Sequence, residues 1–217
     1  MLIAFLNAGS FKMIRVLDRT NRHQYIRTLD QHFRLRHEIF VKERGWKDFE
    51  RDGVYEKDQY DNDNATYLIS IDDQENVVGS FRLYPTVLPH MLSEQFSALI
   101  DGAVLQRIDI LEMTRLAIHR NQRGTQTYFE LFLALQEYCL EQGVSGATNL
   151  VRTHRIPVVQ KAGMNIIPLG LSKEIDGEMC TPALLEISEE ILQRMRKVAG
   201  ITETVMEDRM RPVRKIA

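Results

Sequence analysis

Alternating and β-branched apolar residues predict a series of strands along the chain. We expect them at residues 13–17, 66–71, 77–84, 109–118, 144–151, 164–169 and 179–187. The second and third strands flank the polar segment 72–76, which predicts an antiparallel hairpin. The segment 109–118 is typical of a central strand, although ten residues leave a helix open as an alternative.

Apolar residues at three- and four-residue spacing predict the helices. We expect them at residues 21–44 (one or two helices), 91–100, 125–142, 154–162 and 188–198. Gly45, Gly143 and Gly163 are typical of helix ends, and Pro157 fits only a first turn. Strands and helices alternate after an initial hairpin, so the pattern predicts an α/β fold: a mixed, mostly antiparallel sheet with helices on both faces.

The chain is long enough for one sizeable core. Its 217 residues are 44% hydrophobic and carry a net charge of −2. We expect one domain over residues 1–200 and a polar, solvated tail over residues 201–217. A less favoured alternative is that the basic end of this tail binds an acidic protein. The balanced charge indicates neither nucleic acid nor an anionic membrane as a partner.

Cysteine usage and hydropathy predict a cytoplasmic protein. Cys139 and Cys180 are too few for a disulfide framework and are expected to be buried thiols. The apolar run 1–16 lacks a preceding basic region and a convincing cleavage site, and no apolar run approaches the ~20 residues of a membrane span. The histidines show no metal-ligand spacing, so we expect no metal site.

Charge and aromatic rings are concentrated between residues 33 and 61. Gly45 separates a polar helix from Trp46, the only tryptophan. Three carboxylates follow within six residues, at Glu56, Asp58 and Asp61. Like charges this close oppose folding unless cations offset them. The cation is either Arg36, within the chain, or a positively charged substrate.

Charged residues also occur in two predicted strands. Arg82, in the hairpin, has the pattern of a solvated strand arginine when taken alone. Glu112 and Arg115 lie three apart, so they should face opposite sides of the sheet unless a bulge re-aims one of them. An ionised pair there indicates either a structural salt bridge or a functional cleft.

Taken together, these residues resemble the acyl-homoserine-lactone synthases, the autoinducer synthases of bacterial quorum sensing. The blocks RLRHEIF, ERGW, DQYDN, RLYPT and EMTRLAI look like family blocks, and the resemblance covers about residues 14–190. Met164 stands where the family commonly has tryptophan. The matching motif positions are Arg36, Phe40, Trp46, Glu56, Asp58, Asp61, Arg82, Glu112 and Arg115.

The resemblance implies a fold similar to the acyl-CoA-dependent N-acetyltransferases, a three-layer sandwich. It implies an acyltransferase that joins an acyl thioester to S-adenosylmethionine, closes a lactone and releases methylthioadenosine. Both molecules are substrates, and no permanently bound cofactor is expected. The acyl donor is acyl carrier protein or acyl-CoA, and the block from Phe33 to Trp46 looks most like the subset that takes branched or aryl acyl-CoA.

The resemblance also implies roles for single residues. Asp58 and Asp61 meet the cationic end of S-adenosylmethionine, with Glu56 in the same cluster. Arg36 and Arg115 either hold its carboxylate or balance the aspartates. Glu112 is the expected base, and Arg82 completes the catalytic group or buttresses the aspartates. The remaining candidates are Phe40 (core or substrate contact), Trp46 (over adenine or sulfonium), and Thr148, Asn149 and Gly124 along the acyl thioester.

Two other functions stay open. One is a different acyl-CoA-dependent N-acyltransferase of the same fold, for which the acidic cluster has no evident use. The other is a catalytically silent binding domain, which would be free to lose its charged residues.

Overall fold

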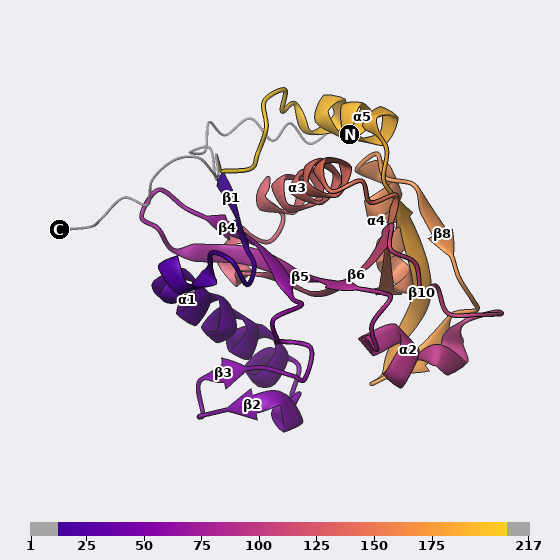
Figure 1. Ribbon diagram of the computed structural model, residues 1–217, viewed down its shortest axis with the longest axis horizontal. Coiled ribbons are helices and arrows are strands. Elements are labelled where there is room, and N and C mark those ends of the chain that lie inside the picture. The colour runs from indigo at the N-terminus through magenta and orange to yellow at the C-terminus, as the bar shows by residue number, and fades with distance from the viewer. Residues whose placement is uncertain (1–12, 208–217) are drawn as a thin grey trace. The chain divides into compact units, whose positions relative to one another are not determined.

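The computed structural model describes residues 13–207 (Figure 1). These residues form two compact units. The first unit contains described residues 13–81, 117–131 and 205–207, and the second contains 82–116 and 132–204. Strands β5 (Val77–Pro85) and β6 (Ile110–Ile118) and helix α3 (Thr127–Glu141) each contribute to both units. Predictions for residues 1–12 and 208–217 lie outside the described residues.

The main sheet is mixed and mostly antiparallel, as predicted. Its strands are hydrogen-bonded in the order β1-β4-β5-β6-β7-β10-β8, and β9 pairs with β10. β1 pairs antiparallel with β4, β10 pairs antiparallel with β7, β8 and β9, and β6 pairs parallel with β7. The other bounds are β1 Met13–Leu17, β4 Thr66–Ile71, β7 Gly146–Arg152, β8 Ile166–Pro168, β9 Lys173–Ile175 and β10 Glu178–Glu186.

In the first unit, one long helix changes its winding part-way. α1 (Ile26–Arg36) continues as a π-helix (His37–Glu43), which Gly45 ends at φ 79°. The Gly45 N–H donates to the Val41 carbonyl at 3.0 Å. A small sheet of β2 (Glu50–Arg51) and β3 (Tyr55–Glu56), which was not predicted, lies beside this helix (Figure 1).

In the second unit, short helices lie within or close to the predicted ranges. They are α2 (Met91–Gln95), α4 (Ile156–Lys161, with Pro157 in its first turn) and α5 (Glu189–Ala199). α2 ends at Gln95, five residues before the predicted end at residue 100. The Ser188 hydroxyl caps α5 by accepting the Ile191 N–H at 3.2 Å. Single 3-10 turns occupy Arg22–Gln24, Lys47–Phe49, Ser97–Leu99, Arg120–Gln122 and Thr153–Arg155.

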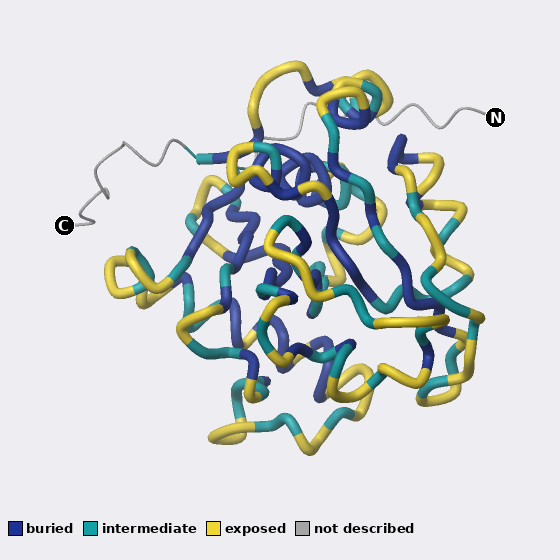
Figure 2. Tube along the Cα trace, turned by 45° about the vertical axis from the view of Figure 1, so that its right-hand side comes forward, coloured by how far each residue is buried: buried dark blue, intermediate teal, exposed yellow. Residues whose placement is uncertain are grey.

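Burial follows the strands and one side of α1 and α5, whereas α3 is buried on nearly all sides (Figure 2). Cys139 and Cys180 are buried free thiols, as predicted, and burial raises the pKa of Cys139 to about 12. Within residues 13–207, no helix has the length and apolar character required to cross a membrane.

Residues 205–207 pack against β1. The Ile14 N–H donates to the Val205 carbonyl, and the Glu207 N–H donates to the Ile14 carbonyl, both at 2.8 Å. Val205 and Met206 are buried. We expected the chain to be solvated from residue 201 onward, and this expectation does not hold for residues 205–207.

Candidate active site

In the first unit, a fully buried arginine binds two carboxylates of residues 56–61, which we call the acidic segment. Arg36 donates from Nε to Glu56 at 2.6 Å, and from Nη1 and Nη2 to the two oxygens of Asp61 at 2.7 and 2.8 Å. Asp61 also accepts from the Tyr67 hydroxyl at 3.0 Å and from the Asp58 N–H at 2.9 Å. One set of hydrogen bonds thus links Arg36 of α1, Glu56 of β3, Asp61, and Tyr67 of β4.

Charge balance explains why Arg36 is tolerated in the interior. Burial lowers the pKa of the guanidinium, but the charges of Asp61 and Glu56, with their hydrogen bonds, raise it by more, so the net shift is upward. Bidentate pairing with a carboxylate is the arrangement that best offsets desolvation of an arginine. Of the two roles left open for Arg36, the contacts favour balancing the carboxylates.

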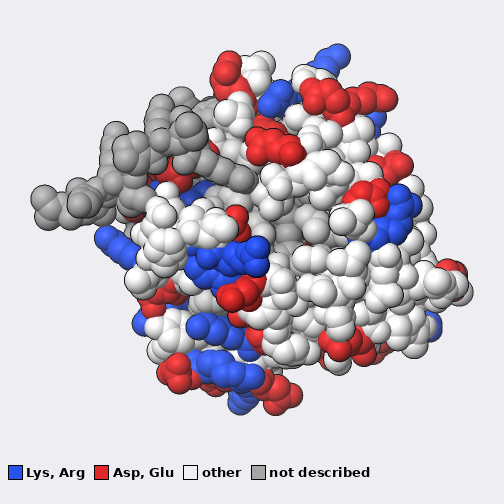
Figure 3. Space-filling model, in the orientation of Figure 1, with Lys and Arg blue, Asp and Glu red and all other residues white. Residues whose placement is uncertain are grey.

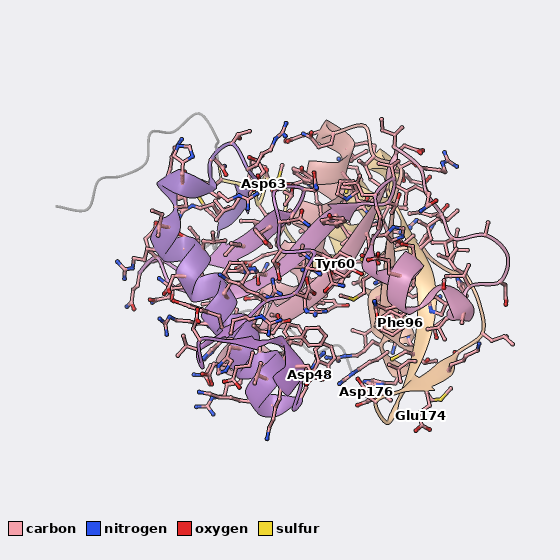
Figure 4. The ribbon with its side chains drawn as sticks, turned by 60° about the horizontal axis from the view of Figure 1, so that its bottom comes forward. Asp48, Tyr60, Asp63, Phe96, Glu174 and Asp176 are labelled. Carbon is pink, nitrogen blue, oxygen red and sulfur yellow. The ribbon has the colours of Figure 1, made fainter. Side chains whose placement is uncertain are left out.

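Asp58 lies in the tight turn that shapes the acidic segment. Its Oδ1 accepts the Tyr60 N–H at 2.9 Å, and Tyr60, labelled in Figure 4, is buried. The Asp58 side chain stays half-buried. Lys, Arg, Asp and Glu alternate on the surface over α1 and the β2-β3 sheet (Figure 3).

The π-helix brings Phe40 against Trp46. Their rings stack with centroids 5.1 Å apart and an interplanar angle of 13°, and the Arg44 guanidinium lies 4.9 Å from the Phe40 ring. Phe40 is 2% exposed, so the core alternative describes its packing. Trp46 is half-buried, and Phe40 covers one face of its indole.

In the second unit, Glu112 receives the first backbone amides of α2. Its Oε2 accepts the Met91 N–H at 3.0 Å, and its Oε1 accepts the Leu92 N–H at 2.6 Å. Burial raises the pKa of this carboxyl, while the Leu92 N–H, the positive charge of His90, the Met91 N–H and Arg82 act to lower it. No local sequence pattern indicates that the first amides of α2 bind this carboxylate.

The backbone of β6 is distorted at Arg115. Arg115 has φ 56°, a left-handed conformation that is rare for residues other than glycine, and Arg115 and Glu112 are 7% and 2% exposed. β6 is therefore irregular at one of the two charged positions, and both of these side chains are buried. The Arg115 Nη1 lies 3.6 Å from the Met91 sulfur.

Arg82 is fully buried, so its interpretation as a solvated strand arginine is wrong. Its Nε donates to the Thr114 hydroxyl at 3.1 Å. The reason is that nearly all of β5 is buried on both faces, where polar residues at alternate positions face protein rather than water.

The parallel pairing of β6 and β7 is short. Its register is Ile110 with Gly146, Leu111 with Ala147 and Glu112 with Thr148, although both strands run on beyond these pairs. We call the point after Glu112 and Thr148 the fork. Asn149 follows it, and its buried Oδ1 accepts no hydrogen bond from any described residue.

The predicted residues thus fall into two groups. The first unit holds Arg36, Phe40, Trp46, Glu56, Asp58 and Asp61, with Gly124 at φ 78° in the turn before α3. The second unit holds Arg82, Glu112, Arg115, Thr148 and Asn149. Residues 13–207 contain no cluster of three or more His, Cys, Asp or Glu suited to a metal ion.

Sequence reasoning missed three buried polar residues that lie beside the candidate site residues. His32 lies one turn before Arg36 and its Nδ1 is 2.9 Å from the Ser80 hydroxyl. Tyr67 bonds Asp61, and His90 precedes the α2 amides that bind Glu112. The four-residue spacing of His32 and Arg36 could have revealed the first, but nothing local marks the other two.

Comparison with known proteins identifies the family. The family model described as autoinducer synthase matches residues 20–195. The chain belongs to the autoinducer synthase family. The resemblance drawn from its motifs is thus confirmed.

Relatives of this autoinducer synthase carry the expected names. It is 35% identical to the isovaleryl-homoserine lactone synthase of Bradyrhizobium diazoefficiens over 198 residues, 90% of each chain. It is similar to the structure of BjaI, a CoA-dependent acyl-homoserine lactone synthase with SAM and isopentyl-CoA, at 34% identity and TM-score 0.84, covering 93% of this chain and 95% of that one. A putative N-acetyltransferase from Lactobacillus plantarum, at 14% identity and TM-score 0.56 over 81% of this chain and 99% of that one, shares the fold alone, as predicted.

Proposed function

We propose that this autoinducer synthase transfers the acyl group of an acyl-CoA to the amino nitrogen of S-adenosylmethionine and then closes the homoserine lactone. Methylthioadenosine and CoA are the other products. Family membership and full-length similarity to an isovaleryl-homoserine lactone synthase support the reaction. The structural observation that carries it is the fork, which begins at the candidate base, Glu112.

The fork suits an extended acyl thioester. Beyond Glu112 and Thr148, β6 and β7 continue without pairing to each other among the described residues, so their facing edges have backbone donors and acceptors to offer. A pantetheine arm contains two amides and can pair with such an edge as an added strand does. The thioester would then lie near Glu112, with Thr148 and Asn149 along the acyl chain.

Glu112 is proposed as the base for amide formation. The amine can attack the thioester only after it loses a proton. A buried carboxylate with a raised pKa is a stronger base than an ordinary glutamate, and its two backbone hydrogen bonds fix its orientation. Arg82 and Arg115, buried in the same unit, complete the proposed catalytic group.

The acidic segment is proposed to receive S-adenosylmethionine. Its ammonium and sulfonium favour a site with fixed anions, and Asp58 lies beside the Arg36 cluster that holds Glu56 and Asp61. The Phe40–Trp46 stack offers an aromatic surface for the adenine or the sulfonium. Lactone closure then requires positioning of the carboxylate in line with the carbon that bears the sulfonium.

The donor is proposed to be a branched or aryl acyl-CoA used in the cytoplasm, with no nucleic acid or membrane as partner. The block from Phe33 to Trp46 indicates that subset, and a relative at 35% identity is named for isovaleryl transfer.

The decisive experiment is a donor panel. The purified chain is incubated with S-adenosylmethionine and either acyl-CoA or acyl carrier protein thioesters, and products are identified by mass spectrometry. We expect lactone and methylthioadenosine in equal amounts, with branched or aryl acyl-CoA preferred. Acylation of other amines without methylthioadenosine would indicate the N-acyltransferase alternative, and no turnover with any donor would indicate a silent domain.

A further inference from the structure

A fully buried histidine lies against the guanidinium that binds the acidic segment. Nη1 of Arg36 lies 3.5 Å from Nε2 of His32, and Nδ1 of His32 lies 2.9 Å from the Ser80 hydroxyl. An arginine side chain stays protonated and only donates hydrogen bonds, so Nε2 carries no hydrogen and accepts from Nη1. Nδ1 therefore carries the hydrogen of a neutral imidazole and donates it to Ser80.

The same imidazole also packs on the second donor to Asp61. The ring centroids of His32 and Tyr67 lie 4.6 Å apart, and the Tyr67 hydroxyl donates to Asp61 Oδ1 at 3.0 Å. Arg36 Nη1 donates to that same oxygen at 2.7 Å. Two donors that share one carboxylate oxygen thus both contact His32. The imidazole limits the movement of both donors, and with them the direction of the carboxylate.

The charges around Arg36 favour a neutral acceptor at this position. Three hydrogen bonds of the guanidinium go to carboxylate oxygens of Glu56 and Asp61, and a fourth goes to His32. Two carboxylates already offset the charge of one guanidinium, so a third anion beside it would add repulsion. An imidazole nitrogen satisfies a further buried N–H of Arg36 without that cost.

Asp61 links this arrangement to the turn that holds Asp58. Its Oδ2 accepts Arg36 Nη2 at 2.8 Å and the Asp58 N–H at 2.9 Å. Asp58 is half-buried, whereas the Asp61 side chain is only 1% exposed. The contacts therefore run from buried His32, through Arg36 and Asp61, to the backbone of a residue that solvent and substrate can reach.

We propose that His32 is a positioning residue for S-adenosylmethionine. This rests on the proposed function, in which the acidic segment receives that substrate. Nε2 of His32 fixes the Arg36 guanidinium, which holds Asp61 and the Asp58 backbone in the geometry that binds the substrate cation. His32 is buried beneath these groups and contacts no reacting atom, so it acts on substrate binding and not on the acyl-transfer step.

The test is a matched pair of substitutions at residue 32. The amide of glutamine reaches the position of Nε2 and can accept from Arg36, whereas the shorter asparagine reaches only the position of Nδ1, beside Ser80. We expect His32→Asn to raise the KM for S-adenosylmethionine about tenfold, as one lost hydrogen bond to a charged group does, and His32→Gln to restore it. His23→Asn, at an exposed position of the same unit, should equal wild type.

The two kinetic constants separate positioning from a general loss of structure. Both variants at residue 32 should keep the wild-type kcat at saturating S-adenosylmethionine and the wild-type KM for acyl-CoA. A smaller folded fraction would instead lower kcat and leave every KM unchanged. A wild-type KM for S-adenosylmethionine in His32→Asn, or a glutamine variant no better than the asparagine variant, would overturn the proposal. Ser80→Ala, which removes the acceptor that fixes the tautomer, replaces His32→Asn if that variant does not fold, and a wild-type KM there has the same meaning.

Nitrogen-15 NMR of the wild-type protein tests the contact without turnover. We expect His32 to be the neutral Nδ1–H tautomer at neutral pH, and an Nε2–H tautomer or an imidazolium would contradict the contact with Arg36. Wild-type lactone formation is measured first. Its absence counts against the proposed function, whereas lactone formation with the wrong tautomer or unaltered KM values counts against His32 alone.

Discussion

At the scale of single residues, Glu112 combines burial, two backbone hydrogen bonds and a raised pKa. Glu112→Gln keeps the shape but cannot take a proton, so we expect single-turnover acyl transfer to slow ~10²-fold or more. Binding of S-adenosylmethionine, measured by calorimetry, should be retained. Glu141→Gln, at an exposed position on α3, is the control. Equal rates in variant and wild type would remove Glu112 as the base.

The same carboxyl sets the acid side of the pH profile. Because burial raises its pKa above the ordinary 4.5, Glu112 becomes protonated, and stops acting as a base, at a higher pH than an ordinary glutamate does. We therefore expect kcat/KM to fall with decreasing pH along a limb that lies above pH 4.5. A rate that stayed level down to that pH, with the protein still folded, would contradict the assignment.

Asp61 pairs with both terminal nitrogens of Arg36, whereas Glu56 accepts its Nε. It accepts both Arg36 terminal nitrogens, the Tyr67 hydroxyl and the Asp58 N–H. Asp61→Asn weakens the buried pair and leaves donors facing donors, so we expect a loss of about 3 kcal/mol in unfolding free energy by urea denaturation. Asp63→Asn is the matched control, because the Asp63 side chain is 88% exposed. Equal losses would show that Arg36 does not depend on Asp61.

Sequence reasoning placed opposite charges in the right segments but could not assign their contacts. It paired Arg36 with the acidic cluster, and the structure shows which oxygens take part. It described Arg82 as solvated, because alternation along a strand reports a face and not what covers that face. Glu112 accepts the backbone amides of Met91 and Leu92, which lie 21 and 20 positions earlier in the chain, and no local pattern contains that information.

At the scale of elements, the periodic spacing of apolar residues determined which helices and strands could be predicted. β1 and β4 match their predicted ranges, because five or six alternating residues define a strand. β2, β3 and β9 have two or three residues each and were missed, since so few positions show no period. The π-helix was also missed, because apolar spacing near four residues does not distinguish it from an α-helix.

The positive φ of Arg115 in β6 allows two substitutions at that position to be compared. Arg115→Gly and Arg115→Ala both remove the guanidinium, but only alanine keeps a Cβ at φ 56°. We expect the glycine variant to be the more stable by ~1 kcal/mol, because a left-handed conformation costs a non-glycine residue about that much. The measurement is the denaturation midpoint of each variant. A more stable alanine variant would place Arg115 in an ordinary strand conformation in solution.

At the scale of the whole molecule, the last described residues close the first unit. Arg15 donates to both oxygens of Glu207 at 2.6 and 2.8 Å, to Glu75 at 3.0 Å and to Thr28 at 3.1 Å. Burial lowers the pKa of Arg15, but Glu207 and Glu75 raise it by more. This cluster ties β1 and α1 to a segment almost two hundred positions later in the chain, a contact that no spacing could predict.

Loss of the contact between Arg15 and Glu207 should lower the free energy of unfolding and leave the rate of acyl transfer unchanged. Glu207→Ala removes two charge-assisted hydrogen bonds from a largely buried arginine, so we expect unfolding free energy to fall by about 2 kcal/mol. Glu203→Ala, at an exposed position, should have little effect. Acyl transfer below the melting range should equal wild type in both variants, because neither residue belongs to the two candidate groups. If both variants denature at the same urea concentration, Glu207 does not hold the segment; if Glu207→Ala alone slows acyl transfer while folded, the closure of the first unit also shapes the acidic segment.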